Sequence, residues 1–258
     1  IIVFSSIIVF SCNIPANENL NKPNILFMMS DDHTSQAWGI YGGILEKYAI
    51  NKNIKRLAAE GVVLENAFCT NSICVPSRAS VLTGQYSHKN QVYTLTDALE
   101  PDQLNVAKIL RNSGYQTALI GKWHLKKQPS GFDYFNVLPG QGRYNNPLLK
   151  DINNWEDGNK GGRLYEGFSS DVIMNESIKW LEKRNKDKPF MLMTHFKATH
   201  EPFDYPDRFK NLFVGETLPE PESLLDFYPG KSGRTFEGQI LEILTERWIK
   251  ATKTKSIR

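Results

Sequence analysis

The sequence lacks several features that would narrow its class at once. It has only three cysteines, an odd and small number that does not make a disulfide scaffold. Neither sign of charge dominates, because 31 lysines and arginines are set against 28 acidic residues, for a net charge of +3. With the basic residues scattered, this balance gives no indication of nucleic-acid binding. Internal repeats and low-complexity blocks are also absent, which excludes repeat architectures.

Long apolar runs are scarce as well. Only Ile1–Ser11 is almost continuously apolar, and it is shorter than the about 20 residues that span a bilayer. It suits the hydrophobic part of a secretory signal whose start is missing. Val9–Cys12 is similar to a bacterial lipobox, so Cys12 would be acylated and attach the protein to a membrane; plain cleavage and secretion is the alternative. We expect residues 1–22 to be a leader and tether of an exported protein, in the periplasm, at the cell surface or secreted.

The rest of the chain alternates between apolar runs and amphipathic segments. Its 258 residues, 40% of them hydrophobic, are enough for one large core. This order predicts an α/β fold with a largely parallel central sheet flanked by helices. The expected strands are 24–29, 62–64, 115–120 and 189–196, and the expected helices are 53–61, 104–114, 169–183 and 238–248. Residues 130–162, rich in Gly, Pro, Asn and aromatics, are expected to form a long loop facing the substrate.

Polar side chains follow three of the expected strands. Asp31-Asp32 follows the first, Gly121–His124 ends the next, and Thr199–Pro202 trails from the last. Functional sites of α/β folds lie at the carboxyl ends of parallel strands. Adjacent carboxylates suit a hard divalent cation, although a helix cap or a turn is the common reason for an Asp-Asp pair.

The segment Cys74–Gly84 carries the most specific pattern in the chain. Pro76 is favoured in the first turn of a helix, and no helix breaker follows before Gly84. Cys74 is therefore expected at a helix N-terminus, where free N–H groups and the helix dipole favour an anion.

Read as C-x-P-S-R-x-x-x-L-T-G, this segment resembles the signature of the type I, formylglycine-dependent sulfatases of the alkaline-phosphatase-like superfamily. The resemblance implies that a formylglycine-generating or anaerobic sulfatase-maturating enzyme oxidises Cys74 to an aldehyde. One hydroxyl of the hydrated aldehyde would attack sulfur, and the alcohol would leave with a proton from a histidine. The second hydroxyl would then expel sulfate.

The resemblance also assigns the site residues. It implies that Asp31, Asp32 and the matured Cys74 bind Ca²⁺, in preference to Mg²⁺. It also implies that Arg78 and His124 bind the aldehyde hydrate and that Lys122 binds the sulfate. His200 would contact the sulfate or protonate the leaving alcohol. His33, His88 and His195 are not expected to be catalytic, and His195 is expected in the core. We expect Cys69 to be a buried apolar side chain, with a Cys69–Cys74 disulfide as the alternative.

The resemblance also indicates a substrate and a boundary. Residues 30–43 (SDDHTSQAWGIYGG) and 135–144 (FNVLPGQGRY) are similar to bacterial glycan sulfatases, including the N-acetylglucosamine-6-sulfatase-like group, so a sulfated carbohydrate is the expected substrate. No Asp-Asn or Asp-His pair follows His200, where the family completes its metal site. Residues 23–258 are therefore expected to be the N-terminal part of the catalytic domain, without the C-terminal subdomain.

Three other functions compete with this interpretation, and the Cys74–Arg78 run argues against the two phosphatase alternatives. The chain could be a truncated, inactive fragment or a glycan-binding relic, because part of the expected metal site is missing. A phosphatase or phosphodiesterase of the same superfamily would use Ser or Thr as nucleophile and usually two metal ions. A cysteine phosphatase would separate its Cys and Arg by more residues than Cys74 and Arg78.

Overall fold

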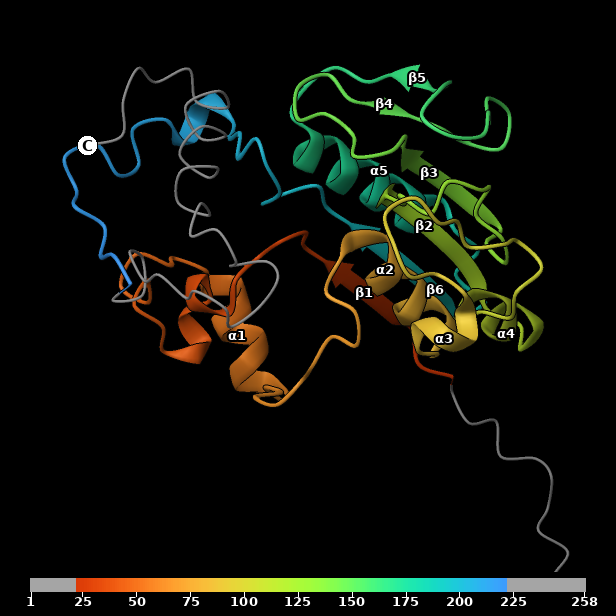
Figure 1. Ribbon diagram of the computed structural model, residues 1–258, viewed down its shortest axis with the longest axis horizontal. Helices are drawn as coiled ribbons and strands as arrows, with labels where there is room; N and C mark the ends of the chain where they lie inside the picture. The colour runs from red at the N-terminus through yellow and green to blue at the C-terminus, as the bar shows by residue number, and fades with distance from the viewer. Residues whose placement is uncertain (1–21, 222–258) are drawn as a thin grey trace, which may run out of the picture.

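The computed structural model describes residues 22–221, in which a four-stranded sheet lies between two layers of helices (Figure 1). The strands pair in the order β1-β6-β2-β3, and every pair is parallel. The strands are β1 (Ile25–Met29), β2 (Gln116–Lys122), β3 (Tyr134–Leu138) and β6 (Phe190–His195). The predicted parallel sheet is confirmed. A separate antiparallel pair is formed by β4 (Leu148–Leu149) and β5 (Arg163–Leu164).

Helices cover both faces of this sheet. One face carries α2 (Cys74–Thr83), α3 (Ser87–Asn90) and α4 (Val106–Asn112), and the other carries α5 (Ser169–Lys183). The predicted boundaries of α4 and α5 hold within two residues. The side chain of Asn105 caps α4 by accepting from the backbone N–H of Lys108 at 3.0 Å. Short 3-10 turns lie at Ser35–Ala37, Gly39–Tyr41 and Asp207–Phe209.

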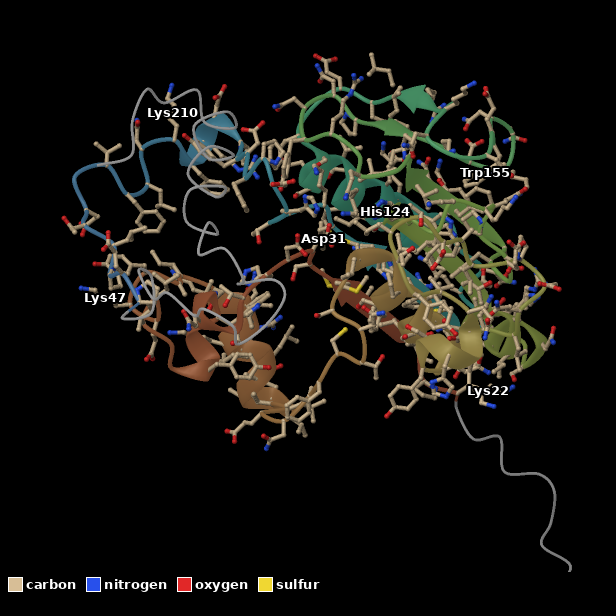
Figure 2. The ribbon with its side chains drawn as sticks, in the orientation of Figure 1. Lys22, Asp31, Lys47, His124, Trp155 and Lys210 are labelled. Atoms are coloured by element: carbon tan, nitrogen blue, oxygen red, sulfur yellow. The ribbon has the colours of Figure 1, made fainter. Side chains whose placement is uncertain are left out.

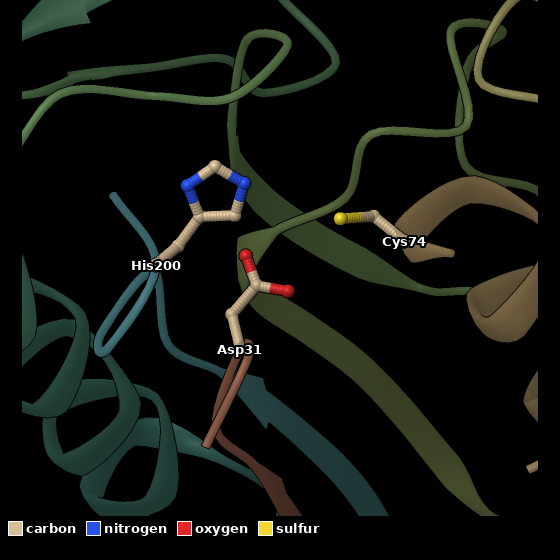
Figure 3. A group of neighbouring side chains, drawn as sticks. All are labelled: Asp31, Cys74 and His200. Carbon is tan, nitrogen blue, oxygen red and sulfur yellow. The ribbon is translucent and has the colours of Figure 1, made fainter. Parts of the chain in front are cut away.

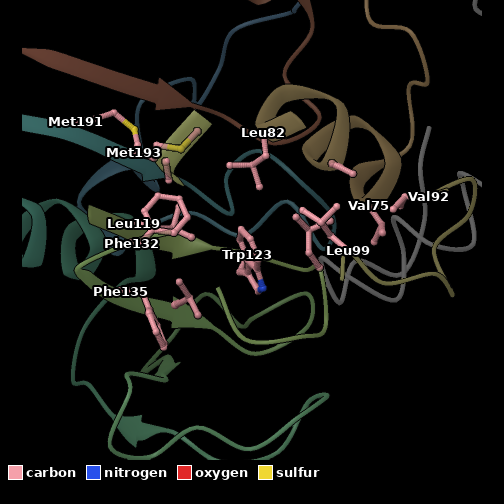
Figure 4. Close-up of a cluster of buried hydrophobic side chains, with 14 of the residues drawn as sticks. Val75, Leu82, Val92, Leu99, Leu119, Trp123, Phe132, Phe135, Met191 and Met193 are labelled. Atoms are coloured by element: carbon pink, nitrogen blue, oxygen red, sulfur yellow. The ribbon is translucent and has the colours of Figure 1, made fainter. Parts of the chain in front are cut away.

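Strand alternation divides the core into two clusters. In β2, Leu119 packs against the α2 and α4 side together with Trp123 and Phe135 (Figure 4). Its neighbours Ala118 and Ile120 pack against the α5 side. All three β2 residues have no exposed surface, because a central strand of a doubly covered sheet is buried on both faces.

Gly121 is required where β2 approaches β6. Its φ is 102°, and a Cβ at this position would lie 1.9 Å from the carbonyl oxygen of His195. Only glycine allows both the positive φ and this close approach. The glycine therefore lets the ends of β2 and β6 present Lys122 and His195 side by side.

Several sequence expectations about apolar segments are wrong. The predicted buried strand β1 is instead an edge strand, with Leu26 52% and Met28 49% exposed, because within residues 22–221 it pairs only with β6. Residues 62–64 form no strand, and Val62 is 84% exposed. The expected loop 130–162 contributes β3 to the sheet.

Two helices are less buried than their patterns predict. Helix α1 (Lys52–Glu60) matches the predicted segment but lies apart from the sheet and buries no residue (Figure 1). In α5, Val172 and Ile173 are buried as expected, whereas Ile178 is 45% exposed. An apolar stripe shows which face of a helix is able to pack, but a neighbour must be there to cover it.

Some predictions fall outside the described residues. The leader with Cys12 and the helix expected at 238–248 both lie there. Between residues 22 and 221 the structure contains no helix with the length and apolarity needed to cross a bilayer.

We expect Leu119→Ala to lower the free energy of unfolding by about 2–5 kcal/mol, because it removes buried atoms and leaves a cavity in the central strand. Urea denaturation measures this change. Leu57→Ala on α1 is the matched control, since Leu57 is 56% exposed and should change stability by at most about 0.5 kcal/mol. Equal losses in the two variants would contradict the assignment of the core.

Candidate active site

The predicted site residues come together at the carboxyl ends of the parallel strands. Asp31 follows β1, Lys122 ends β2, and His200 lies in the loop after β6. Helix α2 adds Cys74 and Arg78 from the opposite side. Cys74, Arg78, Asp31 and Asp32 line one cavity of about 490 Å³. Segments far apart in the sequence thus supply a single pocket.

Cys74 is the first residue of α2, as predicted. The helix begins after Ile73, which offers no side-chain cap, so the free N–H groups of the first turn stay available for an anion. Burial, together with Asp31 and Asp32, raises the pKa of the Cys74 thiol above its ordinary value despite Lys122 and Arg78. A raised pKa disfavours the thiolate, so the unmodified side chain is a weak nucleophile.

Asp31 connects the positively charged residues of the site. It is 5% exposed, and its Oδ1 accepts from Arg78 Nη2 at 3.1 Å. Its Oδ2 accepts from Lys122 Nζ, and the same ammonium donates to Gln141 Oε1 at 2.6 Å. Burial opposes ionisation of this carboxyl, but Arg78 and Lys122 outweigh it and lower the pKa. Asp31 is therefore a carboxylate at neutral pH.

Arg78 is buried and holds three strand ends together. Besides Asp31, its Nη1 donates to the carbonyl of Lys122 at 2.8 Å and contacts His195 Nδ1 at 3.2 Å. His195 Nδ1 also lies 3.2 Å from the carbonyl oxygen of Lys122, so the tautomer decides whether this nitrogen accepts from Arg78 or donates to that carbonyl. Burial, followed by the charge of Arg78, lowers the pKa of His195 to about 3. The expectation of a core histidine is confirmed, with the addition that it orients Arg78.

Asp32 and His200 complete the cluster. Asp32 has a φ of 54°, a left-handed conformation that Asp tolerates, so the chain turns sharply between the two carboxylates. His200 Nε2 lies 3.6 Å from Asp32 Oδ2. Ligand atoms of Asp31, Cys74 and His200 lie within 4.8 Å of one another and point into a common space (Figure 3).

The donor set fits a hard divalent cation. Asp31 and Asp32 offer carboxylate oxygens beside position 74, which is the ligand chemistry that Ca²⁺ and Mg²⁺ prefer. Ca²⁺ takes about 6–8 oxygen ligands, more than the two carboxylates supply. Asp31 is also shared with Arg78 and Lys122, so a cation would compete with two fixed positive charges for this side chain.

His124 is not among the clustered ligand atoms of Asp31, Cys74 and His200, but it lies near Asp31 (Figure 2). Its Nδ1 is buried without a hydrogen-bond partner within residues 22–221. Burial, followed by Lys122 and Arg78, lowers its pKa to about 4, so the ring is neutral at neutral pH. No hydrogen bond joins His124 to Cys74 in the structure, and the predicted role of His124 at the aldehyde hydrate stays a prediction. His33 lines the same cavity as Cys74, whereas His88 is exposed on α3.

The expectation for Cys69 is wrong. Its side chain is exposed and lines the cavity beside Cys74, because the loop before α2 runs along the cavity rim. Both cysteines are free, so the alternative disulfide is not formed. The Cys69 thiol donates to the backbone carbonyl of Asn71 at 3.2 Å and to Ser77 Oγ at 3.3 Å.

Sequence reasoning missed three residues near the site. Gln141 contacts Lys122, Lys197 is buried behind His200, and Tyr144 donates to the His200 carbonyl. Gln141 and Tyr144 lie within the run FNVLPGQGRY, which was interpreted only as substrate-facing. Both residues follow β3, a strand in a segment that was expected to be a loop, so no sequence signal marked them.

Comparison with known proteins settles the family. A family model for sulfatases matches residues 23–235, which is most of the chain. The chain belongs to the sulfatase family. This sulfatase is 40% identical over 243 residues to N-acetylglucosamine-6-O-sulfatase of Bacteroides thetaiotaomicron, covering 92% of this chain and 42% of that protein. Human N-acetylgalactosamine-6-sulfatase is 29% identical over 211 residues, covering 70% of this chain and 40% of the human protein.

A solved structure confirms the fold. It contains a protein in complex with its substrate D-glucosamine-2-N,6-O-disulfate, and it matches this sulfatase with a TM-score of 0.75 and 35% identity. The match covers 90% of this chain and 48% of that one. The expected alkaline-phosphatase-like fold is therefore found, and the chain spans about half the length of the relatives it matches.

The neutral, buried His195 predicts a pH effect on stability. The pKa of His195 is about 3 in the folded protein, below the ordinary 6.5. As the pH falls, the unfolded chain therefore binds a proton at His195 before the folded protein does, and the free energy of unfolding decreases. Between about pH 7 and about pH 4, the free energy of unfolding of the wild type should decrease by about 3 kcal/mol more than that of His195→Asn, a variant that keeps an acceptor near Nδ1. Urea denaturation at several pH values measures this difference. For the exposed control His88→Asn, the difference from the wild type should not change with pH. If this difference changes with pH as much as it does for His195→Asn, the prediction is wrong.

Proposed function

We propose that this sulfatase hydrolyses the sulfuric ester of a sulfated carbohydrate, with residue 74 matured from cysteine to formylglycine. One observation carries the proposal: residue 74 opens α2 directly beside the Asp31 carboxylate that binds both Arg78 and Lys122. The 40% identity to an N-acetylglucosamine-6-O-sulfatase and the likeness to a complex with a glucosamine disulfate support a sulfated amino sugar as the substrate.

The residues around position 74 suit a sulfate group. The N–H groups at the start of α2 would donate to its oxygens, because they have no helical acceptor. Lys122 and Arg78 are fixed and buried, so they would stabilise negative charge in a pocket of low dielectric. Both are held by Asp31 before any substrate binds, which reduces the reorganisation that the reaction requires.

Two chemical groups would be added to this scaffold. A hydrated aldehyde at position 74 would supply two hydroxyls, which a plain serine or cysteine does not. Ca²⁺ held by Asp31 and Asp32 would supply positive charge beside the nucleophile and the sulfate.

His124 and His200 would have different roles in the reaction. His124 is neutral because its pKa is about 4, so it suits hydrogen bonding better than proton donation. His200 lies in the metal cluster with its Nε2 toward Asp32, which places it to bind the sulfate or to protonate the leaving alcohol. We assign the general-acid role to His200.

An inactive or glycan-binding form is the second candidate. Asp31 and Asp32 are the carboxylates that line the cavity in the described part of the chain, and they do not complete a calcium site by themselves. A phosphatase that uses the Cys74 thiolate is disfavoured by the raised pKa of that thiol.

Maturation can be tested directly. After coexpression with a formylglycine-generating enzyme, mass spectrometry of the peptide that contains residue 74 should show conversion to the aldehyde. The matured protein should release sulfate from glucosamine-6-sulfate, and Cys74→Ala should not, because alanine offers no nucleophile. Complete conversion without sulfate release from any sulfated amino sugar would favour the inactive alternative.

Calcium binding can be tested without turnover. Isothermal titration should show that Asp31→Asn and Asp32→Asn each weaken Ca²⁺ binding by about 10-fold or more, since each removes a charged ligand. Asp187→Asn is the control, because Asp187 lies in the turn between α5 and β6, away from the cavity. If the wild-type chain itself binds no calcium, the proposed metal role is wrong for the chain as given.

A further inference from the structure

Two buried side chains beside the cavity donate to consecutive backbone carbonyls. Tyr144 Oη donates to the carbonyl of His200 at 2.5 Å, and Lys197 Nζ donates to the carbonyl of Glu201 at 3.2 Å. Tyr144 is 3% exposed and Lys197 is 2% exposed. The Lys197 ammonium also lies 4.8 Å from the centre of the Tyr144 ring, so the two donors form one unit.

The second of these carbonyls also sets the state of the His200 ring. His200 Nδ1 lies 2.8 Å from the carbonyl oxygen of Glu201. A carbonyl only accepts, so Nδ1 carries the hydrogen and, in the neutral ring, Nε2 carries the lone pair. Nε2 is the nitrogen that faces Asp32. The carbonyl that Lys197 binds therefore decides which nitrogen of His200 is available to the site.

The loop that carries His200 is anchored on its other side by the aspartates. The N–H of Asp31 donates to the carbonyl of Ala198 at 2.9 Å, and the N–H of Thr199 donates to the carbonyl of Asp31 at 2.7 Å. Tyr144 is itself held by ring stacking on Phe168 at 5.3 Å and by the N–H of Ser169, which donates to its carbonyl at 2.6 Å. The start of α5 and the aspartate turn thus fix His200 from two directions.

We propose that Lys197 and Tyr144 are positioning residues that hold the 200–201 carbonyls, so that Nδ1 of His200 keeps its hydrogen and Nε2 is the nitrogen that gives a proton to the leaving alcohol. This inference rests on the proposed function and names two residues that act through His200. Neither touches the reacting atoms.

Stability alone does not explain a lysine at position 197. Burial, followed by the charge of Lys122, lowers the pKa of Lys197, which means that its charged form is disfavoured there. Methionine has a similar length and would fill the same space without the cost of desolvating an ammonium. A buried cation with one carbonyl acceptor is costly, so a role in holding that carbonyl accounts for it better than packing does.

Lys150 provides a matched control in the same fold. It is 1% exposed, donates to the carbonyls of Glu156 and Gly158, and lies 4.1 Å from the Trp155 ring centre. It therefore has the same chemistry as Lys197, but its two acceptors lie in another loop. Lys150→Met tests the loss of a buried lysine without disturbing the His200 loop.

The experiment is ¹⁵N NMR of the full chain labelled at histidine, recorded at about pH 9, where neutral imidazole prevails. The chain has 5 histidines, and His200→Asn identifies the His200 signal by its loss. We expect the Nδ1–H tautomer for His200 in the wild type and in Lys150→Met. Lys197→Met and Tyr144→Phe should shift His200 toward Nε2–H, and Lys197→Arg, which keeps a donor, should restore most of the wild-type signal.

Kinetics of the matured protein provide the second measurement. Lys197→Met and Tyr144→Phe should lower kcat by about 10- to 100-fold with little change in KM, because they misplace a group without removing it. An unchanged His200 tautomer in both variants would overturn the inference. A shifted tautomer in a protein whose wild type releases no sulfate would support the inference while refuting the proposed function. If Lys197→Met fails to fold, Tyr144→Phe, which removes one oxygen, decides the test.

Discussion

The ion pairs of Asp31 are the interaction on which the rest of the site depends. A single buried carboxylate joins the end of β1 to α2 through Arg78 and to the end of β2 through Lys122. Removing it would leave two buried cations without their partner, which is more costly than losing an exposed ion pair. Because the backbone of Asp31 also pairs with the 198–199 segment, the same residue locates the loop that carries His200.

This arrangement keeps opposite charges in balance inside the pocket that we propose binds a sulfate group. Arg78 and Lys122 are buried, and a site with these two cations alone would pay a large desolvation cost. Asp31 reduces this cost and leaves both cations beside position 74. A divalent cation at the same carboxylate would add positive charge and would share this ligand with the two side chains. The metal and the two cations would then act as one electrostatic unit.

The sheet supplies the rigidity that such a unit requires. β2 and β6 are buried on both faces, and Gly121 allows their ends to approach closely enough for Arg78 to contact Lys122 and His195 together. The loops beyond the strand ends then add side chains that the strands cannot place, such as Gln141 and Tyr144. Their positions depend on β3, a strand within a segment whose composition is typical of loops.

The sequence by itself determined the family, the parallel α/β architecture and the residues at the strand ends. Cys74–Gly84, Asp31-Asp32 and Gly121–His124 are local patterns, and local patterns need only neighbouring residues to be recognised. The sequence did not determine which apolar segments are covered by other parts of the chain. Apolar side chains of β1, α1 and residues 62–64 are exposed, because burial depends on a partner far away in the chain. Only the tertiary structure decided that Arg78 binds His195, that Cys69 lines the cavity, and that Lys197 and Tyr144 hold the His200 loop. These contacts join residues up to 117 positions apart, and their energies depend on distances that no sequence spacing expresses.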